Sequence, residues 1–124
     1  MIMDRIEEFT RDGKNFIYID FTGLKYNEDF IEAAKIIKSA IAKHPEKSVH
    51  TITNIENIRF DSNSKSLITE YLQHNEPYVK TGVIIGLDGI KKMMVKAVMK
   101  LSGRKNLNFA FTKEGAIEWI LQQE

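Results

Sequence analysis

The sequence predicts an α/β fold with a mostly parallel sheet and flanking helices. Strand-like apolar segments alternate with segments long enough to form helices, and this alternation favours right-handed crossovers between parallel strands. The chain has 124 residues, 43% of them hydrophobic, which suits one compact domain over residues 1–124. An Asp12-Gly13 turn near the start predicts a β-hairpin. The expected order is β-β-α-β-α-β-α-β-α.

Turn residues and helix breakers separate the expected elements. The first strand ends near 9–11, and a stronger strand at 15–21 follows the hairpin turn. Asn27 is expected to cap a helix at 27–42, which His44-Pro45 ends. Ser102-Gly103 ends the third helix, and Thr112 caps the last one. The remaining expected elements are strands at 49–55, 79–87 and 107–111 and helices at 64–74 and 90–101.

Composition excludes several classes of function. The 18 basic and 17 acidic residues give a net charge of +1 and a pI of about 7.9, which argues against nucleic-acid binding. The chain has no cysteine, and its three histidines lack a metal-binding spacing, so neither a metal nor a cofactor is expected. Acidic residues near the start do not suit a signal peptide, and no apolar run spans a bilayer. We expect a cytoplasmic protein.

A polar cluster is expected at the start of the second helix, after the strand at 49–55. At this position a helix presents free backbone N–H groups, although Ser and Asp are also ordinary helix caps. Other polar residues follow neighbouring strands and are expected at the same rim, where they form a polar crevice without an evident pair of nucleophile and base. We therefore expect no enzymatic activity. The rim comprises Asp20, Asn54, Asp61, Ser62, Asn63, Ser64 and Asp88.

The third helix is expected to be basic on its outer side. The segment 89–111 has six basic residues and no acidic one. On a helical wheel, one broad apolar face would pack on the sheet while Val95 and Met99 point outward beside Lys92 and Lys96. This outer side could be a solvated surface, a homodimer contact, or a basic surface for an acidic partner or membrane. The face expected to pack comprises Ile90, Met93, Met94, Ala97, Val98 and Leu101.

The order of these segments resembles the STAS family of anti-sigma-factor antagonists and transporter regulatory domains, and most closely its small SpoIIAA-like proteins. The resemblance covers essentially the whole chain and includes segments 17–23, 51–60, 78–80 and 109–119. Family members carry Asp-Ser-Ser-Gly at the start of the second helix, with the second serine phosphorylated. Here the matching run is Asp61-Ser62-Asn63-Ser64, so Asn63 occupies the phosphoserine position. Ser62 and Ser64 are the possible modification sites, where a phosphate would meet the positive end of the helix.

The resemblance implies a non-catalytic regulatory module that binds a protein partner through this rim and the neighbouring third helix. A homodimer would instead form through the outward side of the third helix. The alternative is a small-ligand or lipid-binding domain, because the architecture also resembles the Sec14-type fold. In that case lysines of the third helix would meet anionic head groups, above an apolar cavity lined by Met93, Met94 and Val98. An enzyme that uses the polar rim is a third hypothesis, which the absence of a rim His or Cys disfavours.

Overall fold

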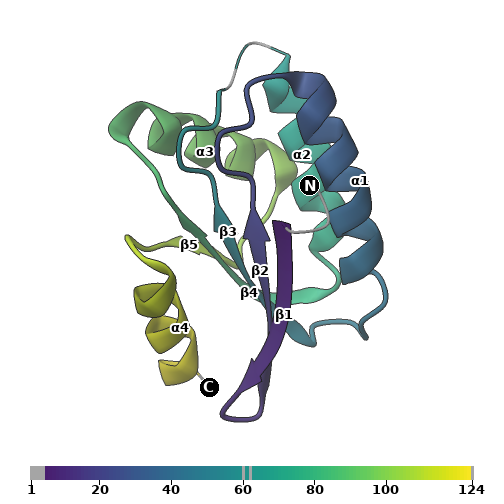
Figure 1. The fold of residues 1–124 in the computed structure, drawn as a ribbon, viewed down its shortest axis with the longest axis vertical. Helices are drawn as coiled ribbons and strands as arrows, with labels where there is room; N and C mark the ends of the chain where they lie inside the picture. Colours follow the sequence, from purple (N-terminus) through teal and green to yellow (C-terminus); the bar gives the residue numbers. More distant parts are fainter. Residues whose placement is uncertain (1–4, 60, 62, 124) are drawn as a thin grey trace.

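The structure, a computed structural model, describes residues 5–59, 61 and 63–123. Its strands form one five-stranded sheet in the order β1-β2-β3-β4-β5 (Figure 1). β1 pairs antiparallel with β2, and all later pairs are parallel, as predicted. The strands are β1 (Ile6–Arg11), β2 (Lys14–Asp20), β3 (Val49–Asn54), β4 (Val79–Ile85) and β5 (Leu107–Phe109). The helices are α1 (Asn27–Ile41), α2 (Ser64–Asn75), α3 (Gly89–Ser102) and α4 (Lys113–Gln122).

The helices divide between the two faces of the sheet. Because β2 to β5 advance in one direction across the sheet, right-handed crossovers place α1, α2 and α3 on the same face. α4 follows the last strand and covers the other face (Figure 1). Alternate residues of the strands supply the two cores. Ile17, Ile19 and Val49 belong to the first core, and Phe16 and Ile52 to the second.

The hairpin and most of the helix ends agree with the sequence. Asp12 and Gly13 both have positive φ, 51° and 79°, which suits the tight turn of a hairpin. The Thr112 hydroxyl accepts a hydrogen bond from Gly115 N at 2.9 Å and so caps α4. Asn27 is different: Tyr26 is the N-cap of α1, and Asn27 is its first helical residue. The cap prediction for Asn27 was therefore wrong.

The orientation predicted for α3 was also wrong, except at Val98, which is buried as expected. Val95 is buried, and Met99 is half-buried against the core. The opposite side of the helix is open, with Ile90, Met93 and Leu101 exposed to 82%, 74% and 65%. Because α3 crosses to β5, a strand of three residues at the sheet edge, little sheet lies beneath the helix to cover its broad apolar side.

Candidate functional site

The start of α2 is a closed network of hydrogen bonds that reaches α1. Asp61 Oδ1 accepts from the backbone N–H groups of Asn63 and Ser64, at 2.8 and 3.2 Å. The Ser64 hydroxyl accepts from Asp61 N at 2.9 Å and donates to Asn27 Oδ1 at 3.0 Å. Asn27 Nδ2 in turn donates to Asp61 Oδ1 at 3.2 Å. The network satisfies free donors in the first turn of α2 and fixes that turn against α1.

These contacts determine the state and access of the rim residues. The hydrogen bond from Asn27, followed by that from Asn63 N, lowers the pKa of Asp61, so its carboxylate is ionised at neutral pH. Asn63 and Asp61 are exposed, whereas Ser64 is buried. Ser62 lies outside the described residues. A phosphoryl group on Ser64 would have to displace the hydroxyl from Asn27, which would open the first turn.

The other predicted rim residues lie at the carboxyl ends of the strands but have separate partners. Asp20 and Asn54 are neighbours across β2 and β3. Asp20 Oδ1 accepts from the backbone N and the hydroxyl of Thr22, and Asn54 donates to Tyr18 Oη at 3.0 Å. Asp88 caps α3 by accepting from Lys91 N at 2.9 Å, and this hydrogen bond lowers the pKa of Asp88. No hydrogen bond or ion pair among the described residues joins these three side chains to Asp61.

A groove that the sequence did not predict reaches one of these residues, Asp88. It has a volume of about 520 Å³ and lies between the β3–α2 loop and the start of α3. Arg59 from the loop and Asp88 at the cap of α3 both line it, and the exposed Ile90 stands at its rim. Basic side chains outnumber acidic ones on its walls, which are Lys25, Asn57, Ile58, Arg59, Asp88, Ile90, Lys91 and Met94.

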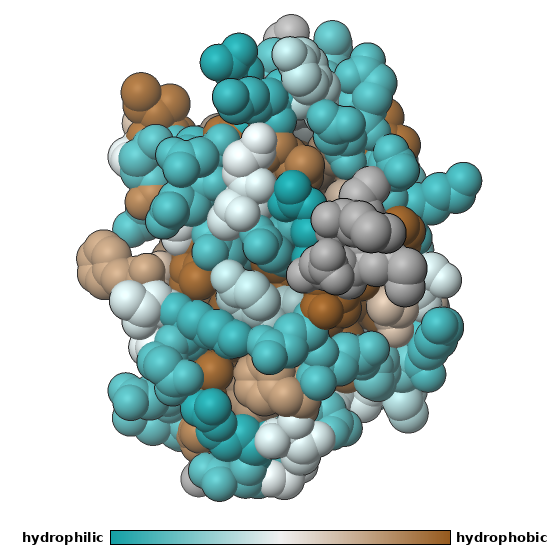
Figure 2. All heavy atoms as spheres, viewed as in Figure 1, coloured by the Kyte–Doolittle hydropathy of each residue, from teal (hydrophilic) through white to brown (hydrophobic). Residues whose placement is uncertain are grey.

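The predicted basic surface of α3 is only partly present. Lys92 and Lys96 are exposed, and Lys92 Nζ lies 5.4 Å from the centre of the Phe109 ring. Arg104, just after α3, is buried instead. The exposed apolar residues beside these lysines are Met93 and Ala97, whereas Val95 and Met99 face the core. Figure 2 shows hydrophobic patches over α3 at the upper left.

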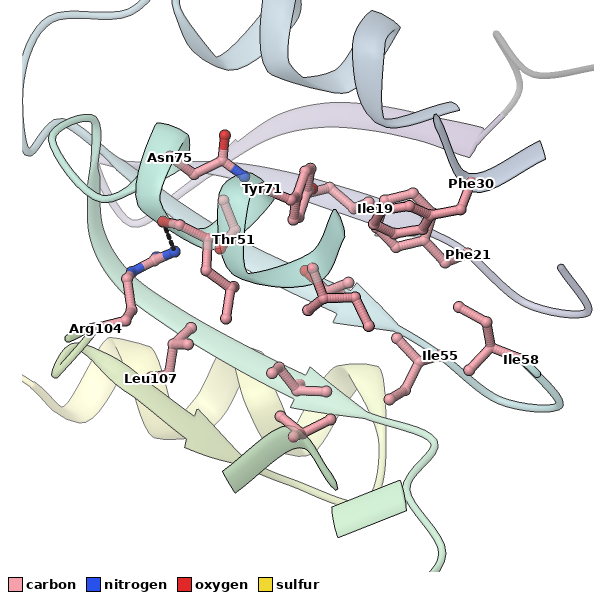
Figure 3. A pocket seen from close by; sticks show the side chains of 15 residues that line it. Ile19, Phe21, Phe30, Thr51, Ile55, Ile58, Tyr71, Asn75, Arg104 and Leu107 are labelled. Carbon is pink, nitrogen blue, oxygen red and sulfur yellow. Dashed lines mark hydrogen bonds between the residues drawn. The ribbon is translucent and has the colours of Figure 1, made fainter. Parts of the chain in front are cut away.

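A second, smaller pocket lies between the sheet and helices α2 and α3 (Figure 3). Its volume is about 50 Å³, and most of its walls are apolar. The cavity expected beneath α3 was to be lined by Met93, Met94 and Val98, but none of these lines this space. Tyr71 of α2, Thr51 of β3 and Arg104 line it instead, and sequence periodicity gave no signal for Arg104.

Metal and membrane features are absent from the described part of the chain. No group of three or more His, Cys, Asp or Glu residues there is arranged to hold a metal ion. Within the same residues, no helix combines the length and apolar character that crossing a membrane requires.

Comparison with known proteins identifies the fold. No protein-family model matches the chain, and no curated protein matches its sequence. One solved structure, an uncharacterized protein of the DUF3478 family with a SpoIIAA-like fold from Shewanella loihica PV-4, superposes with a TM-score of 0.67 at 14% identity. The match covers 92% of this chain and 90% of that one. The chain has a SpoIIAA-like fold.

A second structure with this fold is an anti-sigma-factor antagonist (STAS) domain protein from Planctomyces limnophilus. Its TM-score is 0.59 at 9% identity, and the match covers 93% of this chain and 97% of that one. At these identities the comparisons establish the SpoIIAA-like fold alone, which the sequence resemblance had predicted. Within this fold, Asp61, Asn63 and Ser64 lie at the start of α2, where the resemblance placed them.

Proposed function

We propose that the chain is a non-catalytic regulatory module that binds a protein partner at the start of α2 and in the adjoining groove. The groove is the main support for this proposal. It combines Arg59, a residue type that is enriched in protein interfaces, with the exposed apolar Ile90. The SpoIIAA-like fold, shared with a STAS domain protein, is consistent with such a role.

The expected partner presents apolar and acidic side chains. Ile90 continues along α3 into an exposed stripe with Met93, so an apolar segment of the partner would lie along both. Lys92 and Lys96 flank this stripe, and among the described residues neither forms an ion pair. Acidic side chains of the partner would therefore meet free positive charges.

The capping network offers a way to regulate this surface. Ser64 joins α2 to Asn27 through a hydrogen bond, so a phosphate on Ser64 would disturb the rim. Ser62 is the other proposed modification site, as the resemblance implied. Phosphorylation at either serine is expected to change partner binding by altering charge and local structure at this rim.

A binding experiment with matched variants tests the proposal. The immobilised protein is incubated with an extract of its source cells, and the retained partner is identified by mass spectrometry, purified and titrated. Ile90→Asp places a charge in the groove, and Ile31→Asp makes the same change on α1, where Ile31 is 48% exposed. We expect Ile31→Asp to retain the partner and Ile90→Asp to lose it. Equal retention by both variants, or no partner at all, would overturn the proposal.

Activity assays address the absence of catalysis. We expect no turnover of generic ester or phosphate substrates. Turnover that disappeared in the Asp61→Ala variant would contradict a purely binding role, because it would assign chemistry to the rim carboxylate.

A further inference from the structure

The pocket beneath α2 and α3 has a polar end and an apolar end. Figure 3 shows Arg104, Asn75 and Thr51 toward one end, Phe21, Phe30 and Ile58 toward the other, and Tyr71 between them. A volume of about 50 Å³ is several times what one water molecule needs. A pocket of this kind suits a small molecule with one polar group and an apolar body.

Tyr71 places a buried hydroxyl in this pocket. Tyr71 is 6% exposed, and no group among the described residues meets the geometry of a hydrogen bond to its hydroxyl. Burial raises the pKa of Tyr71, and the nearby Asn75 side chain and Arg104 charge oppose that rise. Its ring is fixed by edge contacts with Phe21 and Phe30, at centre distances of 5.5 and 5.8 Å. Asn75 lines the polar end, but its Oδ1 lies 2.9 Å from His74 Nδ1. A buried hydroxyl without a partner is unfavourable, which points to a group that is bound there in use.

Arg104 supplies a buried positive charge at the polar end. Its side chain is buried, and its Nε and Nη1 donate to Asn106 Oδ1 and the Leu72 carbonyl, the latter at 3.1 Å. Burial lowers the pKa of Arg104 to about 10, so the guanidinium is still charged at neutral pH. Among the described residues no carboxylate lies within 4.0 Å of it. The Glu76 carboxylate acts on the Arg104 charge from farther away and is itself paired with Lys47 at 2.8 Å. A buried charge without a direct counter-ion favours an anionic ligand.

Gly82 of β4 lets side chains pack closely at the polar end of the pocket. A Cβ on Gly82 would lie 2.6 Å from Leu107 Cδ2, 3.2 Å from Thr51 Oγ1 and 3.4 Å from Arg104 Nη2. Thr51 and Arg104 therefore both lie directly beside the glycine, in space that a larger residue would need.

We propose that this pocket binds a small monocarboxylate, with the carboxylate at Arg104 and Tyr71 and the apolar tail among the aromatic and aliphatic side chains of the other end. A carboxylate accepts from both a guanidinium and a phenol, and its bonds to them are charge-assisted. The volume favours a short chain. Only Val95 and Val98 of α3 are fully buried, so an outward shift of α3 would admit longer chains. Among the described residues the pocket shares only Ile58 with the groove, and the proposal does not depend on the protein partner.

Titration with matched small molecules tests the chemistry of the ligand. Butyrate, butyramide, 1-butanol and inorganic phosphate are each added to the full chain and followed by amide chemical shifts in NMR spectra. We expect butyrate to shift the amides of residues that line the pocket, and the uncharged analogues to bind at least about tenfold more weakly. Equal binding of butyramide would overturn the role of charge, and equal binding of phosphate would overturn the role of the tail. No binding of butyrate would overturn the proposal.

The Tyr71→Phe variant separates a binding role from a structural role. It keeps the ring and removes only the hydroxyl, so the midpoint of thermal unfolding is expected to stay or rise while butyrate affinity falls about fivefold. A lower midpoint with unchanged affinity would contradict the proposal. Ile90→Asp in the groove is the matched control and should bind butyrate normally. Loss of butyrate binding in Ile90→Asp would overturn the separation of the two sites.

Discussion

Helices α1 and α3 lie on the same face of the sheet, and both carry apolar residues at helical spacing, yet they pack very differently. α1 buries five side chains, including Ala33, Ile37 and Ile41 at 0% exposure. α3 buries only two, Val95 and Val98, and exposes Ile90 and Met93. The difference follows from position: α1 joins β2 to the central strand β3, whereas α3 crosses to a short edge strand. An amphipathic pattern therefore predicts a helix more securely than it predicts which side of that helix is buried.

This difference has a functional consequence. Helix α3, the more loosely packed of the two, borders both the groove and the pocket, since Ile90 lines the groove and Val95 lines the pocket. Elements that bind and move are drawn from the less stable parts of a fold. α1 and the centre of the sheet supply a rigid frame for them.

The largest expected effect is a difference in the free energy of unfolding between equivalent substitutions on α1 and on α3. Ile37→Ala removes fully buried methyl groups and is expected to lower the free energy of unfolding by about 3 kcal/mol. Ile90→Ala, the same change on α3, is expected to alter it by less than about 0.5 kcal/mol. Urea unfolding followed by circular dichroism measures both values. A large loss in Ile90→Ala would mean that this side of α3 is covered in solution, and the contrast between the helices would fail.

Lower pH is expected to reduce the difference between the opening free energies of amides in α1 and those in α3. Burial, followed by the charges of Lys14 and Lys80, lowers the pKa of His50 to about 4 from the usual 6.5. The unfolded chain therefore takes up a proton at His50 between these values while the folded chain does not. Stability is fully present above pH 6.5 and is lost as the pH falls toward 4, by on the order of 2 kcal/mol in all.

Hydrogen exchange detects this change in each helix. Amides of α1 exchange through global unfolding, so their opening free energy is expected to fall between pH 7 and pH 5. Amides of α3 exchange through local opening, which leaves His50 buried on the opposite face of the sheet. The opening free energy of the α3 amides is therefore expected to stay constant. His50→Gln is the control and is expected to remove the pH dependence. An equal fall in both helices would show that α3 opens only with the whole fold.

A smaller effect is expected at the junction of α1 and α2. Ser64→Ala removes the hydroxyl that bridges Asp61 and Asn27, so the free energy of unfolding is expected to fall by about 1 kcal/mol. Ser66→Ala is the matched control, because the exposed Ser66 hydroxyl bonds only within its own helix, to Asn63 O at 3.3 Å. Chemical denaturation compares the two. Equal losses would indicate that the bridge to α1 adds nothing to stability.

The smallest effect is expected on the outer side of α3. Met93→Ser and Leu101→Ser change residues that are 74% and 65% exposed, so stability and exchange in α3 should change by less than about 0.5 kcal/mol. Val98→Ser is the contrasting variant, because Val98 is fully buried in the same helix. If all three variants lost stability alike, the orientation of α3 in the structure would be incorrect.

The sequence by itself determined the order of the elements, the hairpin and the fold. Asp12-Gly13, the strand at 49–55 and the Thr112 cap carry local signals, because turn geometry, side-chain alternation and capping act between close neighbours in the chain. It also placed Asp61 and Ser64 at the start of α2.

Only the tertiary structure decided which side of α3 is buried, because Ile90 and Val95 belong to two apolar sides that periodicity does not rank. It also buried Arg104, a residue that composition alone assigns to a basic surface. The groove at Arg59 and the pocket at Tyr71 likewise join residues distant in the chain. Such sites depend on how crossovers stack helices on the sheet, and sequence periodicity describes each helix without its neighbours.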